Sequence, residues 1–411
     1  MTENGFTRRD AIAMAATGTL LSACGGTQKS SGPRVAVVGA GIIGASIAYN
    51  LALGGANVTV LERHEIATRA SRGTFAWLNA TWAKQPRQYH RMNQLGLAGW
   101  KELERDLAIP IKWGGSIEWF GSQERQARLS EQIDEQIEWG EPARMIGLAE
   151  LADLEPNVAF GPLSRAAYSP NDGALDPVFA TNTLLQKAVE LGAVVQTNCE
   201  VQSVQETTAE TIAIQTGCGN IEANILVLAT GADPLATEKL TGISVPQRST
   251  PGVIAITEPM EQVLGRIIVA PGVHIHQRLD GRIVLGEQEG APQNEAHAQR
   301  LSGRPHEFPS RELAAQHFAR IMDIAVRYVP ALSQAKIENV HIGWRPLPLD
   351  GHPVIGFSTM QTRAYIAIAH SGVSLAPIIG KLAAQEILTG KAAASLNDYR
   401  PDRAFDEVRR Y

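Results

Sequence analysis

A strand–turn–helix–strand unit near the start of the sequence constrains the fold more than any other feature. Residues 34–38 form the β-branched run R-V-A-V-V, which is typical of a buried parallel strand. The turn G-A-G-I-I-G at residues 39–44 follows and opens an apolar helical stretch that ends near Leu53. A second strand at residues 58–61 ends at Glu62. This order predicts a βαβ unit that binds a dinucleotide.

Each position of the turn has a physical task. Gly39 permits the tight turn, Gly41 lets the backbone approach a pyrophosphate, and Gly44 lets helix and strand pack closely. The helix N-terminus presents its positive end to the phosphates. An acid at residue 62 accepts hydrogen bonds from ribose hydroxyls and disfavours the 2′-phosphate of NADP, but NAD and FAD both fit. The residues expected at the cofactor are Gly39, Gly41, Ile42, Ile43, Gly44, Glu62 and Arg63.

Residues 1–33 predict an export signal. Arg8 and Arg9 precede an apolar stretch at residues 11–23, which is too short to span a bilayer but suits a signal peptide. The paired arginines indicate export by the twin-arginine machinery. The sequence L-S-A-C ending at Cys24 resembles a lipobox, and residues 25–33 are typical of a flexible tether. We therefore expect a periplasmic or cell-surface protein that a lipid at Cys24 anchors to the membrane. An ordinary basic patch and an unmodified cysteine are the alternatives.

Composition excludes several classes of function. The 411 residues exceed what one core usually organises, so two domains are expected. A formal net charge of -5 gives no basic footprint for nucleic acid, so no nucleic-acid partner is expected. The histidines are scattered, without H-x-x-x-H or C-x-x-C spacing, so no metal site is expected.

Five further segments carry motifs in a distinctive order. The first three are A-S-R-G-T at 70–74, D-G-A-L-D-P at 172–177 and I-L-V-L-A-T-G-A at 225–232. The last two are G-W-R-P with D-G-H-P-V-I-G across 343–356, and H-S-G-V-S-L-A-P at 370–377. Together they resemble the D-amino-acid oxidase, glycine oxidase and sarcosine oxidase family, from about residue 34 to residue 397. The C-terminal motifs are the most specific, and they favour FAD over NAD.

The resemblance implies further cofactor contacts and an architecture. In the family, the loop before the C-terminal helix lies against the flavin, where positive backbone dipoles stabilise the reduced anion. The contacts carried over to this sequence are Ser71, Val201, Thr230, Gly231, Gly372, Val373, Ser374 and Leu375. The expected fold class is α/β, with a discontinuous Rossmann-like FAD-binding domain and an antiparallel-sheet substrate domain. The first is expected from residues 34–85, 160–240 and 343–395, and the second from residues 86–159 and 241–342.

Three residues are candidates for the reacting site. By resemblance, Arg345 holds the substrate carboxylate in a two-pronged hydrogen bond, which guanidinium geometry matches. His274 stands where many family members carry a tyrosine that reaches the substrate. His276 points to the same face if this segment is a strand. Both histidines could instead be ordinary polar residues of a half-exposed strand.

Two departures from the sarcosine oxidases bear on the cofactor and the substrate. Ser374 replaces a carboxylate-binding lysine, and Gly343 falls where some members attach flavin through cysteine. Both favour non-covalent FAD and the D-amino-acid or glycine oxidase side of the family. The implied reaction is hydride transfer from the α-carbon to flavin, giving an imino acid and then a 2-oxo acid. Oxygen or a membrane electron carrier is the expected acceptor.

Two alternative functions and one structural question stay open. A membrane-coupled dehydrogenase of the same family, acting on a secondary amine of the sarcosine or D-proline type, is one alternative. A non-catalytic amino-acid-binding lipoprotein is the other. Cys199 and Cys218 flank a predicted hairpin near Thr208, and two unpaired buried thiols are favoured over a disulfide.

Overall fold

The computed structural model describes residues 32–81, 84–208, 210–287 and 303–407. Nearly all of the predicted signal, lipobox and tether lies outside these residues. Within the described ranges, every helix is too short or too polar to cross a bilayer.

A six-stranded sheet forms the cofactor half of the fold, in the order β19-β20-β13-β1-β2-β9. Its strands are β1 (Arg34–Val38), β2 (Asn57–Leu61), β9 (Val194–Gln196), β13 (Ile225–Leu228), β19 (Val354–Phe357) and β20 (Ala364–Ile368). All neighbouring strands are parallel except β19 and β20, which are antiparallel. The predicted strand at residues 34–38 thus lies inside the sheet.

Alternate residues of β1 pack on opposite faces, as strand geometry requires. Val35 and Val37 lie in the core that the sheet shares with four α-helices, while Ala36 packs toward a small antiparallel sheet. These helices are α1 (Ile42–Leu53), α2 (Arg87–Leu107), α5 (Pro177–Glu190) and α9 (Gly372–Thr389). The small sheet contains β10 (Val201–Thr208), β11 (Thr211–Thr216) and β12 (Gly219–Ala223). The helix α6 (Pro234–Thr241) packs beside it.

An eight-stranded sheet forms the second half, in the order β18-β14-β17-β16-β15-β5-β7-β6. Its strands are β5 (Ser116–Glu118), β6 (Arg144–Gly147), β7 (Arg165–Ser169), β14 (Gln247–Thr257), β15 (Ile267–Ala270), β16 (Val273–Gln277), β17 (Ile283–Gly286) and β18 (Ile337–Pro348). All pairs are antiparallel except β15 with β5. This sheet is the predicted antiparallel substrate sheet, and the fold is of the predicted α/β class.

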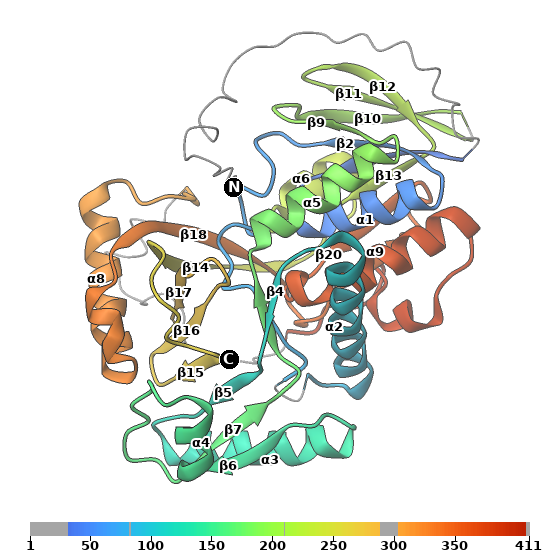
Figure 1. Ribbon diagram of the computed structural model, residues 1–411. Coiled ribbons are helices and arrows are strands. Elements are labelled where there is room, and N and C mark those ends of the chain that lie inside the picture. Colours follow the sequence, from blue (N-terminus) through green and yellow to red (C-terminus); the bar gives the residue numbers. More distant parts are fainter. Residues whose placement is uncertain (1–31, 82–83, 209, 288–302, 408–411) are drawn as a thin grey trace, which may run out of the picture. The chain divides into compact units, whose positions relative to one another are not determined.

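The remaining helices and strands pack around the two large sheets. The helix α8 (Arg311–Tyr328) covers one face of the eight-stranded sheet, where Ile321 and Met322 pack against Ile275 and Leu285 (Figure 1). The helix α2 (Arg87–Leu107) packs on α9. The other elements are β3 (Trp77–Leu78), β4 (Ile111–Trp113), β8 (Gly173–Leu175), α3 (Gln123–Glu138), α4 (Leu148–Leu154) and the 3-10 helices η1 (Pro330–Gln334) and η2 (Ala394–Tyr399).

Sheet membership divides the chain differently from the predicted domain ranges in two places. The strand β18 carries residues 343–348 into the eight-stranded sheet, although the sequence predicts them in the FAD-binding domain. The strand β7 places residues 165–169 in that sheet as well. The motif around Arg345 therefore belongs to a substrate-domain strand that reaches toward the cofactor half.

The structure pairs Cys199 and Cys218 in a disulfide, with their Cα atoms 5.5 Å apart. The favoured expectation of two unpaired buried thiols is therefore wrong on pairing. It is also wrong on burial for one of them, because Cys218 is exposed whereas Cys199 is buried. The two cysteines flank the hairpin of β10 and β11, whose register brings Val201 opposite Thr216 and so draws its ends together.

Candidate functional site

A cavity of about 2050 Å³ lies between the six-stranded and eight-stranded sheets. One part of its wall comes from the turn after β1, the end of β2 and the start of α9. The other part comes from β14, β16, β17 and β18. Ligand sites for small molecules usually measure about 300–1,000 Å³, so this cavity has room for a dinucleotide together with a substrate.

The glycine turn forms a cradle with no room for side chains. Gly39 has φ +105°, and a Cβ there would lie 2.4 Å from the Ala229 carbonyl oxygen. A Cβ at Gly44 would lie 2.0 Å from the Gly39 oxygen, so this glycine permits packing behind the cavity. The backbone N–H of Ile42 donates to the Ser71 hydroxyl at 3.0 Å, and a Cβ at Gly41 would lie 3.2 Å from that oxygen. Gly39, Gly41, Ile42, Ile43 and Ser71 all line the cavity.

Glu62 stands at the end of β2 and is held by the backbone. Its Oε2 accepts from the N–H of Ala40 at 2.8 Å, and its Oε1 accepts from the N–H of His64 at 2.9 Å. The adjacent Arg63 forms an ion pair with Asp233 at 2.8 Å. Both Glu62 and Arg63 line the cavity, so the predicted acid lies beside the glycine turn.

The other predicted cofactor residues divide into two groups. Those that line the cavity are Val201, Thr230, Gly231, Gly372, Val373 and Ser374. Leu375 does not, because its side chain is fully buried in the core that α9 shares with the parallel sheet. The N-terminal turn of α9 thus presents its positive end to the cavity through residues 372–374.

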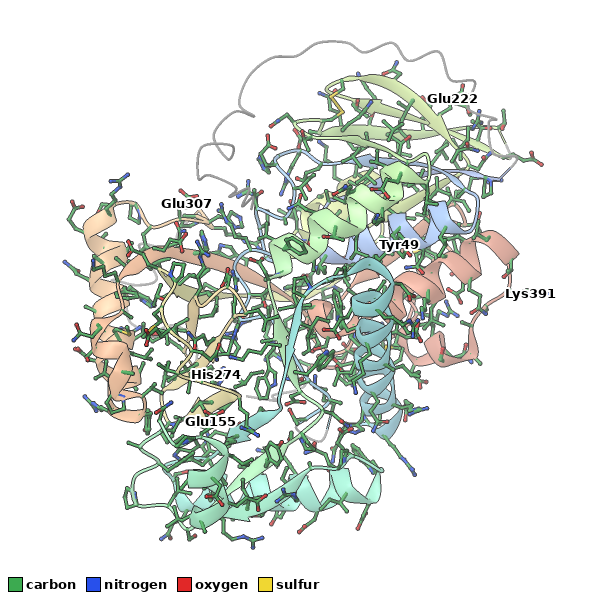
Figure 2. All side chains as sticks on the ribbon, in the orientation of Figure 1. Tyr49, Glu155, Glu222, His274, Glu307 and Lys391 are labelled. Atoms are coloured by element: carbon green, nitrogen blue, oxygen red, sulfur yellow. A yellow bond between two sulfur atoms is a disulfide. The ribbon has the colours of Figure 1, made fainter. Side chains whose placement is uncertain are left out.

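The reacting end of the cavity is formed by β14, β16 and β18. Arg345 lines it from β18, and a Cβ at Gly252 would lie 3.3 Å from the Arg345 Nε, so this glycine makes room for the guanidinium. His274 lines it from β16 (Figure 2), with its ring near Phe75 and Trp77 at 5.5 Å and 6.1 Å between centroids. Burial, and then the charge of Arg345, lower the pKa of His274 to about 3, so the imidazole is neutral near pH 7.

His276 does not reach this site. Its side chain is buried beside Phe75, where Nε2 lies 2.9 Å from the Phe75 carbonyl oxygen. Strand alternation places both histidines on one face, but Phe75 covers the second one. The structure therefore assigns His276 to packing and corrects its predicted catalytic role.

Comparison with known proteins places the chain in a family. The sequence profile described as FAD dependent oxidoreductase (DAO) matches residues 34–386, most of the chain. The chain belongs to this family. It is 26% identical over 379 residues to one of the subunits of opine oxidase from Agrobacterium tumefaciens (strain Ach5), a match that covers 89% of this chain and 96% of that protein. It is 24% identical to the glycine oxidase of Geobacillus kaustophilus (strain HTA426), a match that covers 91% of this chain and 98% of that protein.

The solved structures support the same fold. The glycine oxidase from Geobacillus kaustophilus superposes with a TM-score of 0.78 at 23% identity, covering 91% of this chain and all of that one. The L-amino acid deaminase from Proteus vulgaris also gives 0.78, at 20% identity, covering 95% of this chain and all of that one. The protein is therefore a DAO-family FAD-dependent oxidoreductase that acts on amino acids or amines, and its cofactor is FAD. A non-catalytic binding lipoprotein does not fit this family.

Two arginines and a histidine of the FAD site were not predicted from the sequence. Arg69, Arg304 and His306 line the cavity near the residues expected at the cofactor. Arg304 donates to the Ala232 carbonyl oxygen at 2.6 Å, and its guanidinium lies 5.1 Å from the Trp344 ring centre. Burial, and then the charge of Arg69, lower the pKa of His306 to about 4. The two arginines suit a ligand with a diphosphate, whereas His306 is neutral near pH 7, and no local motif marks any of the three.

Two residues at the reacting end were also missed. His370 precedes α9, and burial, then the charges of Arg345 and Lys84, lower its pKa to about 3. Lys84 donates to the carbonyl and side-chain oxygens of Asn79 at 3.1 Å and 2.5 Å, and to the Asn93 Oδ1 at 2.9 Å. Burial lowers the pKa of Lys84 to about 7. Both residues line the cavity, so the reacting end holds a neutral imidazole and a partly protonated amine in addition to Arg345 and His274.

Proposed function

We propose that this protein catalyses the oxidative deamination of an amino acid, of the D-amino-acid or glycine type, with non-covalently bound FAD. The observation that carries this proposal is the position of Arg345 in the wall of the cavity, beside neutral His274. A planar guanidinium matches a carboxylate in two parallel hydrogen bonds and so fixes the orientation of an amino acid.

Orientation is the main task of these residues. Bound FAD supplies the hydride acceptor. The Arg345 clamp would hold the carboxylate so that the α-carbon faces the cofactor. The rings of Phe75 and Trp77 line the cavity beside His274. His274 can donate or accept one hydrogen bond without carrying charge, because its pKa lies near 3. This arrangement needs no charged base close to the clamp.

Non-covalent attachment is favoured at Gly343. A Cβ at this position would lie 2.2 Å from the Gly73 carbonyl oxygen, so a cysteine would not fit without moving the backbone. The departure from the sarcosine oxidases that join flavin through cysteine thus has a steric reason. Release of free FAD from protein denatured in trichloroacetic acid would support this part of the proposal, and flavin retained in the pellet would contradict it.

Two further parts of the proposal concern the acceptor and the location. We take oxygen as the acceptor and keep an electron carrier of the membrane, with a secondary amine as donor, as the second candidate. We also propose export by the twin-arginine route and lipidation at Cys24, and only the signal sequence supports this part. Mass spectrometry of the mature chain tests the location, because an acylated N-terminal Cys24 supports it and an intact residue 1 contradicts it.

Anaerobic flavin bleaching tests the reaction. A panel of D-amino acids, glycine and sarcosine is added to the holoenzyme, and absorbance of the oxidised flavin is followed. We expect a primary amino acid to bleach the flavin. Arg345→Ala should lower the ratio of the flavin-reduction rate constant to the substrate dissociation constant at least 100-fold. Oxygen or dye reduction then identifies the acceptor. A holoenzyme that none of these amines bleaches would refute the proposed function.

A further inference from the structure

We propose that the cavity contains a second anion-binding site at Lys84, and that the substrate is an amino or imino acid with a second acidic group. This inference rests on the proposed function and specifies its substrate class. One carboxylate would bind Arg345, and the other would replace an asparagine oxygen as a hydrogen-bond acceptor of Lys84.

The ammonium of Lys84 is fixed in the cavity wall by uncharged groups. Its three hydrogen-bond acceptors are the carbonyl and side-chain oxygens of Asn79 and the side-chain oxygen of Asn93. An ammonium has three N–H donors, so this arrangement holds its position but does not neutralise its charge. The Asn79 N–H also donates to the Ser374 hydroxyl at 3.2 Å, which ties the lysine's support to the start of α9.

The described part of the chain supplies Lys84 with no carboxylate in ion-pair range. The acid whose charge acts on it is Asp172, which accepts from Ser116 at 2.7 Å and Trp77 at 2.8 Å. Burial raises the pKa of Asp172 to about 7, so part of it is protonated at neutral pH. A largely buried cation without an anionic partner is costly, and a bound anion removes much of that cost.

Lys84 and Arg345 act on the same region of the cavity. Both line it, and contacts link the support of Lys84 to the wall that holds Arg345. Asn79 donates its N–H to the Ser374 hydroxyl at 3.2 Å, and this hydroxyl donates to the Trp77 carbonyl oxygen at 3.2 Å. The Trp77 ring lies 6.1 Å from the ring of His274. His370 is neutral near pH 7 and does not cancel either charge. The reacting end thus places Arg345 and Lys84 around a neutral ring. The pKa of Lys84 lies near 7, and a second acidic group bound beside it would favour its charged form.

Substrates with one carboxylate would use only half of this arrangement. Glycine bound at Arg345 would leave the ammonium of Lys84 without an anion. A dicarboxylate would satisfy both cations at once. We therefore expect the protein to discriminate between acids by the second charge rather than by apolar side-chain volume.

The test measures binding of two unreactive acids of equal chain length to the holoenzyme. Succinate and butanoate are titrated separately, and the change in the flavin absorption spectrum gives each dissociation constant. Succinate is expected to bind at least tenfold more tightly than butanoate. In Lys84→Gln, which keeps N–H donors for the asparagine oxygens but removes the charge, the two constants are expected to become equal within about twofold.

Matched variants separate this effect from misfolding and from general charge. Lys391→Met removes the charge of an exposed lysine near the end of the chain (Figure 2) and should leave the ratio unchanged. Lys84→Arg should retain a preference for succinate. FAD content and melting temperature are measured for each variant. If Lys84→Gln is poorly folded, Lys84→Met replaces it in the same titration.

Three outcomes would overturn the inference. They are equal affinities in the wild type, an unchanged ratio in the uncharged variants, or a variant that shifts the flavin reduction potential but not the ratio. The last result would place Lys84 at the cofactor instead of the substrate. The inference fails separately from the proposed function, because succinate binding is measured whether or not any amine bleaches the flavin.

Discussion

Gly343→Ala tests how the two sheets meet at the reacting site. The backbones of Gly73 and Gly343 cross so closely that a Cβ at Gly343 would lie 2.2 Å from the Gly73 carbonyl oxygen. Ordinary contacts begin near 3.4 Å, so the two segments must separate by about 1.2 Å. Overpacking that forces backbone shifts costs about 1–3 kcal/mol, and this case lies near the upper end because both atoms belong to the backbone.

The expected loss of about 3 kcal/mol lowers the melting temperature by roughly 3–4 °C in a chain of this length. Calorimetry of the holoenzyme measures it. Gly147→Ala is the matched control, because a Cβ there meets nothing within 4 Å and φ is -93°, so a shift below about 1 °C is expected. Gly343→Ala should also weaken carboxylate binding, because Arg345 lies two residues away. A Gly343→Ala protein that melts within 1 °C of the wild type and binds butanoate normally would refute the crossing argument.

Three other changes test separate parts of the structure. Glu62→Ala leaves the N–H groups of Ala40 and His64 without their acceptor, so FAD affinity measured by flavin fluorescence should fall at least tenfold, and unchanged affinity would contradict this role. The pKa of His274 falls to about 3 on folding, so between about pH 3 and 6.5 the unfolded state binds more protons and the free energy of unfolding decreases on acidification. His274→Gln should reduce the slope of that free energy against pH, measured by urea unfolding, by up to about 1.4 kcal/mol per pH unit. Equal slopes in the variant and the wild type would count against a buried neutral ring. Reduction of the disulfide of Cys199, which spans 19 positions, should cost about 3 kcal/mol in the same assay, whereas no change would show that the bond adds no constraint.

The parts of the site that could be predicted are those encoded by neighbouring residues. The strand at residues 34–38, the glycine turn and Glu62 are contiguous, and their spacing is imposed by the geometry of one βαβ unit. The C-terminal motif likewise placed Arg345 in the cavity wall. In both cases the residues that determine the position of the side chain are close together in the sequence.

The parts that could not be predicted depend on how side chains pack in three dimensions, which no motif records. Strand alternation put His274 and His276 on one face, but only the position of Phe75, about 200 residues earlier, decides which ring reaches the cavity. Leu375 follows three residues that line the cavity, and the rotation of the helix turns its side chain into the core instead. Lys84 has no motif, because its support by Asn79 and Asn93 exists only after folding.

The G-W-R-P segment also shows why a domain boundary drawn from motifs can divide residues that act together. In the pairing of β14 with β18, Gly252 lies opposite Gly343 and Thr250 opposite Arg345. Gly343 allows the substrate sheet to cross the cofactor half at Gly73, and Gly252 leaves space for the guanidinium two residues farther along β18. The glycine and the arginine of the motif therefore act together, because the close backbone contact at Gly343 sets the position of the Arg345 guanidinium at the boundary between the two sheets. This arrangement needs both domains, so a domain boundary drawn at residue 343 separates Gly343 and Arg345 from Gly252, although the three act together.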